Sequence, residues 1–149
     1  TGPAGSPGGA TGATGASGAT AAPNPAVLVV KVFSDTQDLA VGDGKFIFAI
    51  SADLDLHALL RAEAFVTTVS SSGNPTVQVR NITKAVDMLS TLITIDSNEF
   101  TSYTAVTPSV VNTANDNVST GDRIAIDVDV AGTGAKGLGV ILTFQSPAT

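Results

Sequence analysis

Few side chains in this sequence are able to carry out acid–base or nucleophilic chemistry. His57 is the single histidine, and the chain has no cysteine. A general base usually works beside a nucleophile and a group that orients the base, and no recognisable nucleophile motif accompanies His57. We therefore interpret His57 as a loop or surface residue, expect no catalytic residue, and predict that the protein is not an enzyme.

Two pairs of aspartates could offer oxygen ligands to a cation such as Ca²⁺. They are Asp53 with Asp55, and Asp127 with Asp129. Calcium needs several oxygens that converge on one point, and residues two apart on a strand share a face. Neither spacing matches a known calcium loop, so we interpret both pairs as solvated and predict no metal and no cofactor. The sequence leaves open whether Asp127 and Asp129 bind a cation.

Two polar or glycine-rich stretches could bind ligands. Asn112, Asn115, Asp116 and Asn117 could hydrogen-bond a sugar or a neighbouring subunit, although Asn and Asp also serve the geometry of turns. The glycines between Gly132 and Gly139 lack the lysine–hydroxyl ending and the following helix of a phosphate-binding loop. We predict a hairpin loop at 132–139 and another at 70–75.

The elements that must position these residues are strands. Runs of β-branched and apolar residues with turn residues between them predict about seven or eight strands and no βαβ unit. The fold class is therefore all-β, an antiparallel jelly-roll-like β-sandwich. The predicted strands are 26–33, 45–50, 58–69, 76–82, 89–95, a weak edge strand within 103–111, 123–130 and 140–144.

Side-chain alternation predicts which face of each strand is buried. In 58–69, which also has helix-favouring residues, we predict a strand with Leu60, Ala62 and Ala64 on one face. In 123–130 the alternation places isoleucine and valine inward and Asp127 and Asp129 outward. The strand at 45–50 is apolar on both faces, which predicts that both faces are covered.

The beginning of the chain follows the collagen period. Glycine at every third position is required where three polyproline II helices meet at a crowded axis, so this tract predicts a trimer. The period slips between Gly8 and Gly9, and prolines are sparse, so we expect the tract to depend on the domain that follows. The predicted triple-helix glycines are Gly2, Gly5, Gly8, Gly9, Gly12, Gly15 and Gly18.

Composition divides the chain into three parts. We predict a collagen-like Gly-X-Y stalk at 1–22, hereafter the stalk tract, a linker at 23–26 and a β-sandwich trimerisation or head domain at 27–149. The chain opens in mid-repeat without Met or a signal peptide, so we expect the stalk to be longer. Seven basic and thirteen acidic residues predict no nucleic-acid partner, and no apolar run is long enough for membrane insertion.

Several turn and strand patterns resemble those of bacteriophage structural proteins that carry collagen-like repeats. The resemblance implies a virion surface protein, either a head fibre, a decoration protein or a tail fibre, that is a homotrimer and contacts other capsid or tail proteins. It implies no catalytic residue. The stretches that carry it are VGDG (41–44), NIT (81–83), DMLS (87–90), LITID (92–96), ND (115–116), TGDR (120–123), IDVD (126–129) and AKGL (135–138).

Two functional hypotheses follow. The leading one is a non-enzymatic structural component of a phage virion, a homotrimeric capsid fibre or decoration protein. The alternative is the receptor- or glycan-binding head of a tail fibre, which mediates host attachment through a host-surface glycan. Sugar binding favours exposed aromatic residues, and with no tryptophan and one tyrosine, Tyr103, the chain offers little for it.

Overall fold

The strands form where β-branched and aromatic residues alternate with other side chains, as the sequence predicts. The computed structural model describes residues 25–147, so the stalk tract and its glycines lie outside the described residues. The strands are β1 (Ala26–Lys31), β2 (Gly42–Ala49), β3 (Ala58–Phe65), β4 (Thr76–Asn81), β5 (Val86–Asp87), β6 (Leu89–Thr91), β7 (Ile93–Thr94), β8 (Val110–Val111), β9 (Arg123–Val130) and β10 (Gly139–Gln145).

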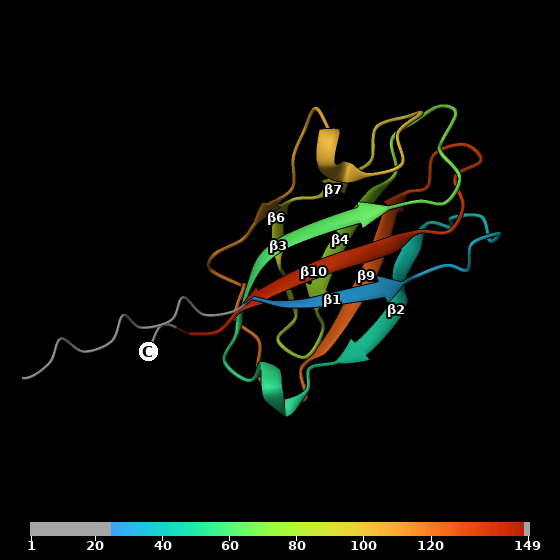
Figure 1. Cartoon of the computed structure of the whole chain (residues 1–149). Helices are drawn as coiled ribbons and strands as arrows, with labels where there is room; N and C mark the ends of the chain where they lie inside the picture. Colours follow the sequence, from blue (N-terminus) through green and yellow to red (C-terminus); the bar gives the residue numbers. More distant parts are fainter. Residues whose placement is uncertain (1–24, 148–149) are drawn as a thin grey trace, which may run out of the picture.

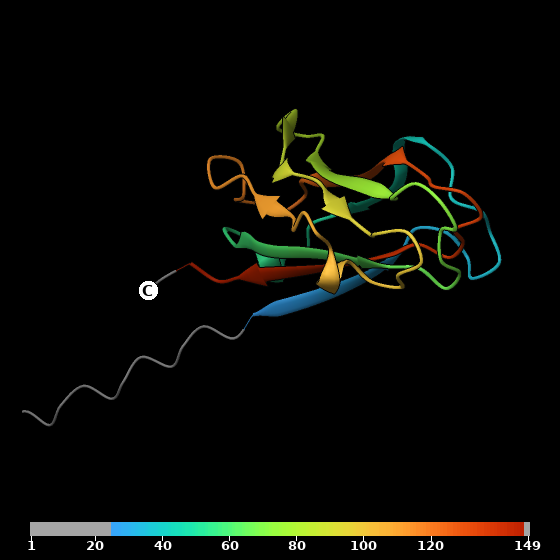
Figure 2. The ribbon, with the colours of Figure 1, turned by 90° about the horizontal axis from the view of Figure 1, so that it is seen from above.

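These strands build two layers, which Figure 2 shows edge-on. The first sheet has the order β1-β10-β3, and the second has the order β2-β9-β4-β5, with β7 also paired to β4. A short third pair joins β6 to β8. Every strand pair is antiparallel, so the all-β, β-sandwich-like prediction is confirmed at this level.

Successive long strands lie in different sheets, except that β4 and β9 both belong to the second sheet. β1, β3 and β10 belong to the first sheet, whereas β2, β4 and β9 belong to the second. The loops 70–75 and 132–139 therefore cross from one sheet to the other, and the prediction that they are hairpin loops is wrong. Sequence patterns identify a turn between two strands, but they do not show whether those strands pair with each other.

The core lies between the two sheets. Ile124, Ile126 and Val128 of β9 are fully buried, as are Leu142 and Phe144 of β10. Burying one such side chain stabilises the fold by about 1.5–3 kcal/mol. The inward alternation predicted for β9 is thus confirmed for these three residues, although Val130 at the end of the strand is exposed.

Four details of the predicted strands are wrong. The strand predicted at 58–69 ends at Phe65, so the β-branched run 66–69 lies outside it. The outward side of β2 is exposed at Ile47 and Ala49, so this strand is covered on one face only. The stretch 89–95 is divided because β6 pairs with β8, whereas β7 pairs with β4. The weak strand within 103–111 is reduced to β8 and preceded by the 3-10 turn η2 (Ser102–Thr104).

Both ends of the described chain lie at one end of the molecule. Ala26 at the start of β1 is paired with Phe144 near the end of β10, as Figure 1 shows on its left side. Of the residues described, η2 and η1 (Ala52–Leu54) are the helical turns, and neither approaches the length needed to cross a membrane.

Candidate functional site

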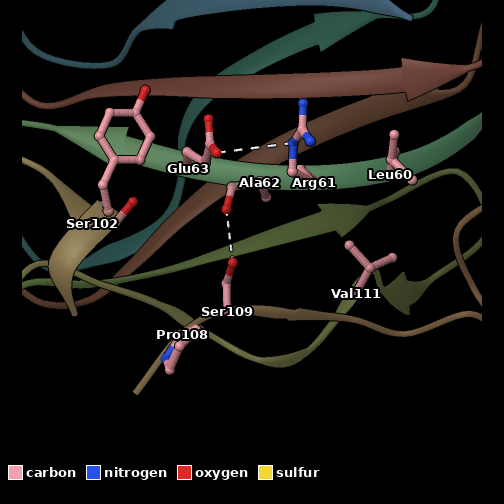
Figure 3. A pocket seen from close by; sticks show the side chains of 9 residues that line it. Leu60, Arg61, Ala62, Glu63, Ser102, Pro108, Ser109 and Val111 are labelled. Carbon is pink, nitrogen blue, oxygen red and sulfur yellow. Dashed lines mark hydrogen bonds and ion pairs between the residues drawn. The ribbon is translucent and has the colours of Figure 1, made fainter. Parts of the chain in front are cut away.

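A surface pocket lies beside the first sheet, next to the edge of β3 that faces away from β10 (Figure 3). It has a volume of about 260 Å³. Its walls come from β3, from η2 and from the chain around β8. The lining residues are Leu60, Arg61, Ala62, Glu63, Ser102, Tyr103, Pro108, Ser109 and Val111. We call it the Tyr103 pocket.

Two serines fix the wall of this pocket against β3. The Ala64 N–H donates to Ser102 Oγ at 3.0 Å, and Ser109 Oγ donates to the Ala62 carbonyl at 2.8 Å. These bonds satisfy backbone groups on an edge that carries no neighbouring strand over this stretch. The two hydroxyls therefore hold η2 and the segment before β8 in place.

A β-bulge sets the side-chain directions at the pocket. Thr143 of β10 is opposite Arg61, but the next residue, Phe144, is opposite Leu59. Leu60 is the extra residue, and a bulge re-aims side chains locally. Leu60 is therefore 44% exposed on the pocket side, whereas Ala62 is buried, and the prediction that the two share one face is wrong.

The pocket combines charge, hydroxyls and one aromatic ring. Arg61 Nε lies 3.9 Å from Glu63 Oε1, and the arginine side chain is largely exposed. An exposed pair of this kind contributes little to stability and leaves the guanidinium free to donate to a ligand. Tyr103 is 61% exposed, so its ring could stack on an apolar sugar face.

The lining of the pocket contains a single carboxylate, that of Glu63. Glycosidases generally place two carboxyl groups on opposite sides of the bond that is cleaved. The residues around Glu63 therefore supply hydrogen bonds and stacking without that catalytic pair.

His57 and the first aspartate pair lie in the loop after β2. His57 Nδ1 is 3.1 Å from the carbonyl oxygen of Asp55, and Asp55 Oδ1 accepts a hydrogen bond from the Thr120 N–H at 2.8 Å. Asp53 belongs to the first turn of η1 and is exposed. His57 thus lies in a loop, as predicted, and Asp55 ties this loop to the loop before β9.

Asp127 differs from the solvated residue that the sequence predicts. It is 5% exposed, and its Oδ1 accepts a hydrogen bond from the Gly44 N–H at 2.6 Å. The irregular register of β2 between Gly42 and Phe46 brings this N–H over the carboxylate. Burial, with the charges of Asp43 and Asp129, raises the pKa of Asp127 despite the Gly44 bond and the charge of Arg80.

Asp129 remains exposed on the same strand. Within residues 25–147 no three acidic, histidine or cysteine side chains are grouped so that they could hold a metal ion. Asp127 and Asp129 therefore have no third side-chain ligand of these types grouped with them.

In the asparagine cluster before β9, the side chains of Asn112 and Asn115 form hydrogen bonds with backbone groups of the chain itself. Asn112 Oδ1 accepts a hydrogen bond from the Ala114 N–H, and Asn115 Nδ2 donates to the Asp87 carbonyl. The Asp116 carbonyl accepts the Leu59 N–H at 2.8 Å. These bonds are the turn chemistry that the composition favours, and they tie the loop to β3 and β5.

A buried polar network that the sequence analysis missed joins β4 to the turn before β9. Asp122 Oδ2 accepts hydrogen bonds from Asn81 Nδ2 at 2.8 Å and from the Ser119 N–H at 2.9 Å, and Lys84 Nζ lies 3.2 Å away. Burial acts to raise the pKa of Asp122, but these hydrogen bonds and the Lys84 charge outweigh it and lower that pKa. The sequence does not reveal this network because Asn81 and Lys84 are distant from Asp122 in sequence.

The residues of the Tyr103 pocket were also missed, apart from Tyr103 itself. Arg61 and Glu63 occupy outward positions on a strand, and Ser102 and Ser109 lie in a polar loop, so no spacing connects them.

No family model, curated protein or solved structure matches this chain.

Proposed function

We propose that this protein is a homotrimeric, non-enzymatic structural component of a bacteriophage virion, a fibre or decoration protein on the capsid surface. The observation that carries the proposal is a Gly-X-Y tract followed within a few residues by β1 of a two-layer β-domain. Three copies of the tract need a domain that holds them in register, because few prolines stabilise it. Capsid or tail proteins are the proposed binding partners.

The strand order supports a jelly roll as the finer description of the domain. The two sheets have the orders β1-β10-β3 and β2-β9-β4-β5, and each successive pair of long strands except β4 and β9 is divided between them. Double-sheet jelly rolls are frequent in viral capsid proteins and in lectins. Architecture alone does not determine function, so the proposal also depends on the repeat and on the resemblance of the turn patterns to those of phage structural proteins.

Mass photometry or analytical ultracentrifugation of the purified chain tests the assembly. We expect a trimer at micromolar concentration, and a monomer would contradict the proposal. Deleting residues 1–22 should leave a trimer if the β-domain determines assembly. Monomers after this deletion would show that the domain depends on the stalk tract instead.

Immuno-electron microscopy of phage particles tests the location. Antibodies against the β-domain should label the capsid surface. Labelling of the tail fibre would favour the second candidate function, and no labelling of intact particles would contradict a virion role.

The second candidate is a glycan-binding head, and the Tyr103 pocket favours it. Its exposed aromatic ring lies with an arginine, a carboxylate and two hydroxyls around one cavity. Removing a stacking ring costs about 1–2 kcal/mol, or roughly a tenfold loss of affinity. We therefore expect Tyr103→Ala to abolish most binding on a bacterial glycan array.

Phe100→Ala provides the matched control for this test. Phe100 is another exposed aromatic residue of the same loop, 58% exposed, but it does not line the pocket. Glycan binding that survives Tyr103→Ala, or that is lost equally in both variants, would contradict a site at the Tyr103 pocket. A wild-type chain that binds no glycan would remove the second candidate and leave the structural role unaffected.

A further inference from the structure

The outward side of β1 is unusually apolar for a strand face that no other part of the described chain covers. Val27 and Val29 are 58% and 65% exposed, whereas Val30 is buried and Leu28 packs against the core. A strand that is apolar on both faces is typical of a sheet covered on both sides. Within residues 25–147 the inner face is covered and the outer face is open.

The apolar surface continues onto the neighbouring strand. Val29 is opposite the partly exposed Ile141 of β10. Charged side chains surround these residues: Arg61 and Glu63 project from the same face of β3, and Lys31 lies 5.1 Å from the centroid of the Phe65 ring. We call Val27, Val29 and Ile141 with this charged rim the β1 face.

β1 also has a free edge among the described residues. It pairs with β10 along its whole length, and no described strand pairs with its other side. The edge of β3 is not free in this way. Ser102, Ser109 and the Phe100 carbonyl form hydrogen bonds with backbone groups along it. An open, apolar edge strand is a surface that natural proteins cover or use for association.

The sequence before β1 indicates what covers this surface. Ala26 follows Ala22, the last residue of the stalk tract, by four positions, a span of at most about 14 Å. In a triple helix the three tracts share one axis, so the three β1 strands must begin close to that axis. The rim carries both signs of charge, which avoids like-charge repulsion between copies.

We propose that the β1 face is the surface through which three copies of this chain contact one another. This inference rests on the proposed homotrimer and adds the location of its interface. The face of one copy packs beside the same strand of the next copy around the threefold axis. The outer face of the second sheet remains directed away from that axis.

Two charge substitutions on the full-length chain test the interface. Val27→Glu with Val29→Glu places carboxylates on the β1 face, and both positions are exposed in the single chain. The matched control is Val41→Glu with Val130→Glu, which changes two exposed valines outside the first sheet. Light scattering after size exclusion measures the mass, and circular dichroism measures folding.

We expect the wild type and the control to be trimers and the β1-face variant to have one third of their mass. A monomeric wild type would contradict the proposed function itself. A trimeric wild type together with a folded, trimeric β1-face variant would overturn the present inference and leave the proposed function standing.

A milder variant keeps the test decisive if the glutamates prevent folding. Val27→Thr with Val29→Thr retains two residues that favour strands. We expect its trimer to dissociate at a concentration at least about tenfold higher than that of the wild type. An unchanged dissociation midpoint would overturn the inference.

Discussion

The outer faces of the two sheets differ at two pairs of outward residues. On the second sheet, the outward residues Gln78 and Asp127 are polar and nearly buried, and both are hydrogen-bonded within the chain. On the first sheet, the outward residues Val27 and Val29 are apolar and exposed. At these four positions the expected arrangement, with polar residues in water and apolar residues covered, is reversed.

This difference separates the stability of the domain from its assembly. Polar groups that the chain itself satisfies rigidify one native structure, and a group that loses its partner imposes a large cost. Valines that are exposed in one copy contribute little to the stability of that copy. They stabilise an assembly when another surface covers them. Substitutions at the buried polar residues of the second sheet should therefore change the free energy of unfolding. Substitutions at the exposed valines of the β1 face should change trimer formation.

The largest loss of stability is expected from Asp122→Ala, in the network at the end of the second sheet. The substitution leaves the buried Asn81 amide and the Ser119 N–H without their acceptor. We expect the free energy of unfolding to fall by about 2–4 kcal/mol, measured by urea denaturation at pH 7. Asp53→Ala, at an exposed aspartate, should change it by less than about 0.5 kcal/mol.

The same network makes a pH-dependent contribution with a defined sign. Because folding lowers the pKa of Asp122, its stabilisation is complete above the unfolded pKa, near 4, and is lost as pH falls through the folded pKa. The difference between wild type and Asp122→Ala should therefore shrink in acid. A difference that stayed constant from pH 7 to pH 2 would contradict this account.

Gln78→Ala should have the next largest effect. The Gln78 side chain donates to the Leu89 carbonyl and accepts from the Leu89 and Val79 N–H groups, so it joins β4 to β6. We expect a loss of about 2 kcal/mol, with faster amide exchange at Leu89. Gln37→Ala, at an exposed loop position, is the control and should leave both measurements unchanged.

Gly139→Ala tests packing on the first sheet. A Cβ at Gly139 would fall within 2.1–2.7 Å of atoms of the Phe65 ring, which must then move. We expect a loss of about 1–2 kcal/mol in thermal or chemical unfolding. If the ring clash is the cause, the loss should be smaller in a Phe65→Ala background, and simple additivity of the two changes would contradict it.

The smallest effect is expected from Asp127→Asn, and it is a gain. The raised pKa of Asp127 means that the folded state disfavours its charge, so stability falls as pH rises from the unfolded pKa to the folded pKa. Asparagine removes the charge and can still accept from the Gly44 N–H. We expect higher thermal stability at pH 7 and little difference near pH 3, whereas equal stability at pH 7 would contradict the account.

Much of the architecture could be predicted from local sequence. The alternation of Ile124, Ile126 and Val128 predicts β9 correctly, and β1, β4 and β10 lie where β-branched runs place them. β3 contains no β-branched residue and ends at Phe65, before the β-branched run 66–69. These patterns report local geometry, which short stretches of sequence determine. The fold class follows from them because strands separated by turns leave few alternatives.

The errors come from contacts between residues far apart in sequence. Leu60 faces outward because of a bulge against β10, and Asp127 is buried because the irregular register of β2 brings Gly44 over it. The Tyr103 pocket depends on Ser102 and Ser109 reaching the edge of β3. None of these contacts leaves a periodic signal, so the candidate site could not be assembled from sequence.

The position of β10 has a consequence for biosynthesis. This strand is the last one described, yet it lies between β1 and β3 and completes the first sheet. A ribosome must therefore make residues 139–145 before the strand that follows the stalk tract gains its partner. In the proposed trimer, a chain cut short before β10 would lack the β1 face, so only copies that contain β10 would be incorporated.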